Sequence, residues 1–173
     1  MATTYTLISS VTVGSGGAAN IEFTSIPATY TDLYVLASIR SNRSGTTESN
    51  ITLKFNASGA NYSRRELDGD GASATSSGAT GISAFEYIYV PSATATANIF
   101  NNIGIYIPNY AGSNNKSFSI DNAQENNITT AYLQLEAGLW SDSSAITSIR
   151  LTEQYGNNLV QYSTAYLYGI SNA

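Results

Sequence analysis

A buried β-strand is predicted by the seven-residue stretch Leu33-Tyr34-Val35-Leu36-Ala37-Ser38-Ile39. Leu33, Val35 and Ile39 lie on one side of an extended chain, and Tyr34 and Leu36 make the other side apolar as well. Because successive side chains of a strand point to opposite faces of its sheet, this pattern indicates a strand that is covered on both faces. We therefore place this strand in the centre of a sheet.

Apolar residues recur at every second position along much of the remaining chain, which is typical of strands rather than helices. Segments rich in Gly, Asn, Ser and Asp separate these runs, and the longest segment, residues 67–81, is expected to be an exposed loop. Roughly ten strands and no helix are predicted. The alternating runs are residues 5–13, 21–23, 33–39, 51–55, 85–89, 99–107, 118–120, 133–139, 149–151 and 162–170.

This number of short strands is too large for one open antiparallel sheet in a chain of this length. We therefore predict an all-β fold, an antiparallel two-sheet sandwich of jelly-roll-like type. Residues 1–173 are expected to form a single domain, because no shift in composition marks a second one.

The composition argues against most enzyme chemistry. The chain has no His and no Cys, and only 11% of its residues are charged. His, Cys and charged side chains are the ones that most often act as nucleophiles, general bases and soft-metal ligands. We therefore expect a structural or binding protein with no catalytic residues and no cofactor. The lack of Cys also excludes disulfides, as is usual for a protein assembled in a reducing compartment.

The charge pattern bears on possible partners. The formal net charge is −5, and the seven Lys and Arg residues are scattered, with Arg64-Arg65 the only adjacent pair. Binding to a nucleic-acid backbone requires clustered basic residues, so we expect no nucleic-acid partner. No apolar run approaches the roughly 20 residues of a membrane-spanning helix, and we expect no membrane partner and no secretory signal.

One short segment resembles half of a metal-binding loop. Residues 66–71 place Asp68 and Asp70 at alternate positions beside glycines, as in the first half of a calcium loop. The distal bidentate Glu of an EF-hand is missing, so a solvated turn is favoured and no metal is predicted, with Asp68 and Asp70 the only weak candidates. Arg64 and Arg65 beside Glu66 are likewise expected to form a solvated edge.

Two further groups of residues leave alternatives open. Glu136, Asp142 and Glu153 could act in glycoside hydrolysis only if two of them faced each other at a fixed distance, which the sequence does not specify. The chain has 13 Tyr and one Trp, Trp140, which suit contact surfaces for proteins or sugars. Tyrosine is also a good strand residue, and alternation favours inward packing of Tyr87, Tyr89, Tyr166 and Tyr168.

Several stretches of the chain resemble a group of small β-sandwich virion proteins of tailed bacteriophages. They are residues 21–35 with Ser38-Ile39-Arg40-Ser41, Phe55-Asn56 with Asn61-Tyr62, Ile107-Pro108-Asn109-Tyr110, Trp140-Ser141 with residues 145–149, and Ala165-Tyr166-Leu167-Tyr168-Gly169-Ile170. The resemblance runs through most of the chain, and it carries no catalytic residues.

This resemblance implies a noncatalytic phage virion structural protein, a capsid decoration or cement protein that binds the assembled shell. Its partners would be the major capsid protein or other virion proteins, and it would act in the virion, after assembly in the host cytoplasm, as a homo-oligomer, with a trimer expected. The alternative is a receptor- or glycan-binding tip module of a tail or fibre, which an exposed cluster of Tyr or Trp140 in a groove would favour. A third possibility, a glycan-cleaving enzyme, requires two carboxylates facing each other across a cleft.

Overall fold

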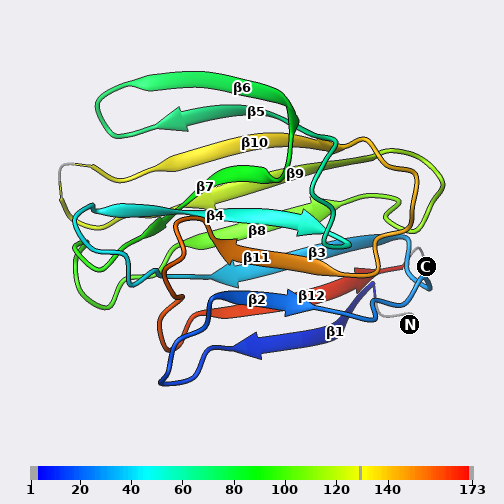
Figure 1. Ribbon diagram of the computed structural model, residues 1–173, viewed down its shortest axis with the longest axis horizontal. Coiled ribbons are helices and arrows are strands. Elements are labelled where there is room, and N and C mark those ends of the chain that lie inside the picture. The colour runs from blue at the N-terminus through cyan, green and yellow to red at the C-terminus, as the bar shows by residue number, and fades with distance from the viewer. Residues whose placement is uncertain (1–3, 129, 172–173) are drawn as a thin grey trace.

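The computed structural model describes residues 4–128 and 130–171, which form twelve strands and no helix (Figure 1). None of these residues belongs to a helix that could cross a membrane. The strands are β1 (Tyr5–Thr12), β2 (Asn20–Phe23), β3 (Asp32–Ser38), β4 (Glu48–Phe55), β5 (Tyr62–Gly69), β6 (Ala74–Ile82), β7 (Phe85–Pro91), β8 (Asn102–Ile107), β9 (Lys116–Ala123), β10 (Leu133–Trp140), β11 (Ile149–Glu153) and β12 (Thr164–Ile170). The all-β prediction is confirmed.

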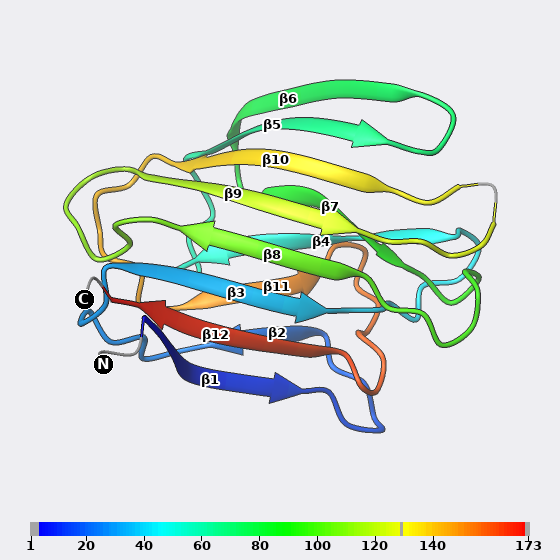
Figure 2. The same cartoon turned by 180° about the vertical axis from the view of Figure 1, so that it is seen from behind.

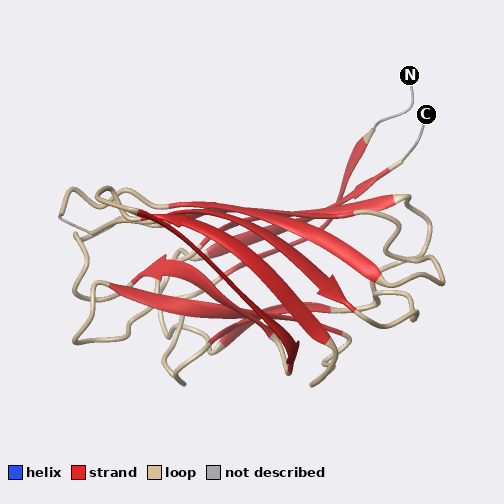
Figure 3. Cartoon of the chain, turned by 90° about the horizontal axis from the view of Figure 1, so that it is seen from above, coloured by secondary structure: helices blue, strands red, loops and turns tan. Residues whose placement is uncertain are grey.

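The strands form two antiparallel sheets that pack as a sandwich, as predicted, and the arrangement is consistent with a jelly-roll-like fold. The larger sheet has eight strands in the order β1-β12-β3-β8-β9-β10-β5-β6, and the smaller has four in the order β2-β11-β4-β7. Figure 2 shows the larger sheet in front, and Figure 3 shows the two layers from above. The β5–β6 hairpin lies at one edge of the larger sheet, beyond the smaller one.

Apolar side chains on the inner faces of both sheets form the core. Its centre is aromatic, with the Phe118 ring centroid 5.2 Å from that of Phe55 and 5.0 Å from that of Phe85. Tyr62 and Trp140 stack beside them with their ring centroids 6.2 Å apart, and the Tyr62 hydroxyl accepts a hydrogen bond of 2.7 Å from the Phe55 N–H. Rings packed edge to face at these distances hold the two sheets in one relative position.

Amide side chains of the larger sheet satisfy the backbone at the buried edge of the smaller sheet, where β7 has no further strand beside it. Gln134 Oε1 accepts the Tyr89 N–H at 2.8 Å, and Gln134 Nε2 donates to the Tyr87 carbonyl at 3.0 Å. Asn122 Nδ2 donates to the Tyr89 carbonyl at 2.8 Å. Unpaired backbone groups at a buried edge would destabilise the fold, so these amides take the place of a missing strand.

The prediction that residues 33–39 form a strand inside a sheet is confirmed, but the prediction that both faces are covered is wrong. Leu33 and Val35 are buried between the sheets, whereas Leu36 on the opposite face of β3 is 41% exposed. Leu36 is exposed because the described chain forms only two layers, so the eight-stranded sheet is covered on its inner face alone.

The prediction of a loop at residues 67–81 is also wrong. These residues complete β5 and form most of β6, which pairs with β5 from Tyr62↔Ile82 to Gly69↔Ala74. The strand β6 is rich in Ser, Thr, Ala and Gly and is largely exposed, so it shows no apolar alternation. Backbone pairing with β5 and the tight turn at Asp70 create this strand, and neither leaves a period-two signal in the sequence.

Replacement of Gly138 by Ala tests the packing of the aromatic centre. A Cβ atom at Gly138 would overlap the buried Phe118 ring, which Phe55 and Phe85 hold in place. Overpacking of this kind typically costs about 1–3 kcal/mol, and we expect Gly138→Ala to lower the free energy of unfolding by that amount in chemical denaturation. The control is Gly59→Ala, because a Cβ at Gly59 has no neighbour within 4 Å. Equal midpoints for the two variants would contradict this packing.

Candidate binding face

The outer face of the eight-stranded sheet is the most distinctive surface of the molecule. It carries large apolar side chains that point to solvent, and these are Leu7, Leu36, Leu67, Leu133, Leu135, Tyr106 and Tyr166. They come from six strands that lie far apart in sequence and are brought together by the sheet. Contiguous apolar surface of this kind marks interaction sites in soluble proteins.

One half of this face is a tyrosine patch, formed by Tyr34, Leu36, Tyr106, Tyr166 and Tyr168. Strand register creates it, because Tyr34 on β3 lies opposite Tyr168 on β12 and Tyr106 on β8, and Leu36 lies opposite Tyr166. Cross-strand neighbours of this type are within side-chain contact of each other. The patch therefore spans three adjacent strands.

Polar contacts at the end of β3 hold the edge of the tyrosine patch in place. The Tyr106 hydroxyl donates to Asp32 Oδ2 at 2.8 Å, and Asp32 Oδ1 accepts the Asn109 N–H at 2.9 Å. The hydrogen bond to Asp32 raises the pKa of the Tyr106 hydroxyl. An ordered ring costs less conformational entropy when it binds a partner than a mobile one does.

The other half of the face is a leucine ridge, formed by Leu67, Leu133 and Leu135. Leu135 on β10 lies directly opposite Leu67 on β5, and Leu133 is two residues away on the same face of β10. The three side chains are 52%, 65% and 56% exposed in the order Leu67, Leu133, Leu135.

A groove of about 850 Å³ separates the tyrosine patch from the leucine ridge. Its floor is formed by small or polar residues of β8 and β9, which are Asn102, Gly104, Asp121 and Ala123. The lack of a side chain at Gly104 leaves room for the Tyr34 hydroxyl, which would lie 2.6 Å from a Cβ at this position. A volume of this size is within the range of small-molecule sites.

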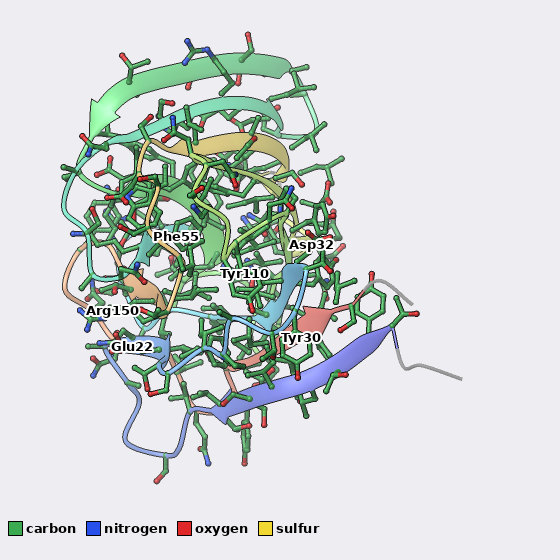
Figure 4. The ribbon with its side chains drawn as sticks, turned by 90° about the vertical axis from the view of Figure 1, so that its right-hand side faces the viewer. Glu22, Tyr30, Asp32, Phe55, Tyr110 and Arg150 are labelled. Carbon is green, nitrogen blue, oxygen red and sulfur yellow. The ribbon has the colours of Figure 1, made fainter. Side chains whose placement is uncertain are left out.

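The outer face of the four-stranded sheet has the opposite character. Arg150 Nη2 donates to both carboxylate oxygens of Glu22 at 2.9 Å, and Lys54 and Thr52 lie beside this pair on β4. Figure 4 shows Glu22 and Arg150 together on one side of the molecule and Asp32 on the other. The two outer faces are therefore chemically distinct, one charged and the other largely apolar.

The aromatic residues considered in the sequence divide between the core and this face. Trp140 is 1% exposed and stacks on Tyr62, so it cannot contact a ligand at the surface. Tyr87 and Tyr89 are half-buried on β7. The prediction that Tyr166 and Tyr168 point inward is wrong. On β12 the buried side chains are those of Ala165 and Leu167, so the alternating Tyr166 and Tyr168 point to the outer face.

The three carboxylates considered for glycan cleavage do not face one another across a cleft. Glu136 is buried between the sheets on β10. Glu153 is buried at the end of β11, where Oε2 accepts the Tyr155 N–H at 2.8 Å and the Asn157 N–H at 2.7 Å. Asp142 is half-buried and accepts the Ser144 N–H at 2.7 Å. Each carboxylate has a different local environment, and no pair of them forms a site.

Asp68 and Asp70 diverge although they are close in sequence. Asp68 faces the interior and accepts a hydrogen bond of 2.9 Å from Gln134 Nε2. Asp70 closes the β5–β6 turn by accepting the N–H groups of Ala72 and Ser73, and these donors lower the pKa of its carboxyl. Within the described residues, no group of three or more acidic side chains is arranged to hold a metal ion.

The expectation of a solvated edge at Arg64, Arg65 and Glu66 is correct only for Arg65. Arg64 and Glu66 face inward on β5, form a buried ion pair and are 8% and 9% exposed. The Arg64 guanidinium also lies 4.6 Å from the centroid of the Tyr87 ring. Arg65 points to the outer face, because strand alternation places neighbouring residues on opposite sides.

Glu136 is the most perturbed acid among the described residues whose pKa value is resolved. It is 1% exposed, and neither carboxylate oxygen has a hydrogen-bond partner there. Burial, with a smaller contribution from the charge of Asp68, raises the pKa of Glu136 to about 8, and Arg64 opposes this shift. Glu136 is therefore largely protonated at neutral pH. The apolar alternation of Leu133, Leu135, Ala137 and Leu139 predicts that Glu136 lies on the outer face of β10, and this is wrong, because the structure buries Glu136 and exposes Leu133 and Leu135.

No protein-family model matches the chain, and a search of curated proteins finds no match.

Replacement of Glu136 by Gln tests the buried acid. The folded-state pKa of about 8 lies above the ordinary value of 4.5, so the folded protein keeps a proton that the unfolded chain releases. The stability that this proton contributes is complete below the ordinary pKa and is lost as the pH rises through about 8. We expect the wild type to lose a few kcal/mol between pH ~5 and ~9, since one pKa unit corresponds to about 1.4 kcal/mol.

Denaturation of Glu136→Gln over the same pH range should show a weaker pH dependence than denaturation of the wild type. Glu86→Gln, which changes a half-buried glutamate on β7, is the control and should follow the wild type. Parallel pH curves for the wild type and Glu136→Gln would show that Glu136 is ionised in the folded protein.

Removal of metal ions is expected to leave stability unchanged. Asp68 and Asp70 already have hydrogen-bond donors from the protein, and they point in different directions. Thermal melting with and without a chelator should give the same midpoint. A drop that added calcium reverses would identify a structural metal ion, because a ligand that binds only the folded state stabilises it.

Proposed function

We propose that this protein is a noncatalytic structural protein of a tailed-phage virion, a capsid decoration protein that binds the assembled shell through the tyrosine patch. The observation that supports this proposal best is the contrast between its two outer faces. The sequence motifs shared with small β-sandwich virion proteins support the phage assignment. The partner would be the major capsid protein or another virion protein.

The surface chemistry explains how such a protein could stay bound. Only 11% of the residues are charged, well below the roughly 25% that is typical of soluble proteins. Burial of hydroxyl, amide and aromatic groups costs less free energy than burial of unpaired charges. Tyr rings also provide rigid contact area of the kind enriched at interfaces. A contact built from the tyrosine patch should therefore be strong and only modestly sensitive to salt.

A second candidate function is a receptor- or glycan-binding tip of a tail or fibre. The observation that favours it is the groove, where Tyr34, Tyr166 and Tyr168 lie beside the polar side chains of Asn102 and Asp121. Aromatic faces next to hydrogen-bonding groups suit sugars as well as proteins. Trp140 does not contribute, because it is buried.

Binding to empty shells of the phage that encodes the chain tests the first proposal. We expect Tyr166→Asp, which adds a charge in the exposed tyrosine patch, to weaken binding at least about tenfold in co-sedimentation. The matched control is Thr152→Asp on the outer face of the four-stranded sheet, which should bind like the wild type.

Failure of the wild type to bind shells at any ionic strength would rule out the decoration function. Binding of a neutral oligosaccharide that Tyr166→Asp abolishes would then support the tip function instead.

A further inference from the structure

We propose that the leucine ridge is an interface with a second copy of this chain, formed around a two-fold axis and closed by two reciprocal ion pairs between Arg65 and Asp121. This interface goes beyond the proposed function, which uses the tyrosine patch on the other side of the groove. It assigns a separate role to the strands β9, β10 and β5.

The ridge is an exposed apolar surface. Its three leucines are each more than half exposed, and they occupy adjacent positions on β10 and β5. Removal of exposed leucine side chains from water is favourable. Two ridges packed against each other would therefore remove six leucines from solvent. That gain gives the contact its driving force.

Two charged side chains flank the ridge, and both lack an ionic partner among the described residues. Arg65 is exposed on β5, and its Nη1 donates to the carbonyl of Arg64 at 2.7 Å. Asp121 is exposed on β9 at the floor of the groove. The described ion pairs are Arg64–Glu66 and Glu22–Arg150, so neither Arg65 nor Asp121 takes part in one. The third charged residue of the strands on this face, Asp32, is already bound by Tyr106 and Asn109.

The sheet register places these two charges symmetrically about β10. Asp121 lies opposite Leu135, and Arg65 lies opposite Ala137 on the other side of the same strand. A two-fold axis that runs parallel to the sheet and passes over β10 between Leu135 and Ala137 exchanges the two positions. Face-to-face packing around this axis brings Arg65 of each copy to Asp121 of the other. The same operation places the leucine ridge of one copy against that of its partner.

This symmetry is the reason to assign the surface to a second copy. In a two-fold interface, the contact from residue i to residue j is repeated from j to i, so the surface must be complementary to itself. One acid and one base at equal distances from an apolar centre meet that requirement. A partner with a different sequence would have to supply both charges independently. Paired charges within an apolar contact also fix its geometry and exclude other arrangements.

Charge reversal tests this interface directly. We expect the wild type to form a dimer in analytical ultracentrifugation over a concentration series. Arg65→Asp and Asp121→Arg should each raise the dimer dissociation constant at least about tenfold, because each variant places like charges together twice. An equimolar mixture of the two variants should form a heterodimer, since both cross pairs are then of opposite charge. The double variant should dimerise alone.

Two further variants separate the interface from general effects of substitution. Leu135→Glu should dissociate the dimer, because it places a charge beside the axis. Lys54→Asp, on the outer face of the smaller sheet, should leave the dimer intact. Circular dichroism of each variant would confirm that it remains folded.

Several results would overturn the proposal. These are a wild type that stays monomeric up to millimolar concentration, a stable trimer of the kind expected from the resemblance, or a variant mixture that fails to associate. The shell-binding test uses Tyr166 on the other side of the groove, and it can fail while the dimer persists. The two proposals therefore stand or fall separately.

Discussion

The pairing of an eight-stranded sheet with a four-stranded one leaves a long sheet face for which the described chain provides no cover. Strand alternation directs every second residue of the larger sheet to that face, whatever its polarity. The chain places leucines and tyrosines at many of these positions, whereas the outer face of the smaller sheet carries Glu22, Lys54 and Arg150. A protein with one charged face and one apolar face is suited to lie flat against other proteins. Both proposals made for this molecule depend on that asymmetry.

The same mismatch in strand number explains the buried polar groups. The smaller sheet ends at β7. Along β5 and β10 the buried side chains change from the rings of Tyr62 and Trp140 to amides and charges. Gln134 and Asn122 occupy the hydrogen-bonding positions that a further strand would have filled. Arg64, Glu66 and Glu136 lie in the same part of the interior, and Glu136 has no partner there. Burial of Glu136 there raises its pKa, so we expect this part of the interior to contribute to the pH dependence of stability.

The arrangement of the outer face divides recognition between two regions. The tyrosine patch and the leucine ridge lie on opposite sides of a groove whose floor is kept low by Gly104 and Ala123. The two regions share no residue and come from different strands, the patch from β12, β3 and β8 and the ridge from β5 and β10.

The amino-acid sequence by itself determined the all-β class and the two-sheet sandwich, because period-two alternation is a local property that each strand carries in its own residues. It also determined the inward position of Leu33 and Val35. On β10 the apolar alternation of Leu133, Leu135, Ala137 and Leu139 indicated the wrong face, because Glu136 and Trp140 are buried and Leu133 and Leu135 are exposed. Only the tertiary structure decided which strands are neighbours, since that depends on contacts between residues far apart in the chain. It created β6 from a segment without alternation, separated Asp68 from Asp70 and left Leu36 exposed. The placement of Arg65 and Asp121 on either side of β10 follows from strand order and register, which no local pattern encodes.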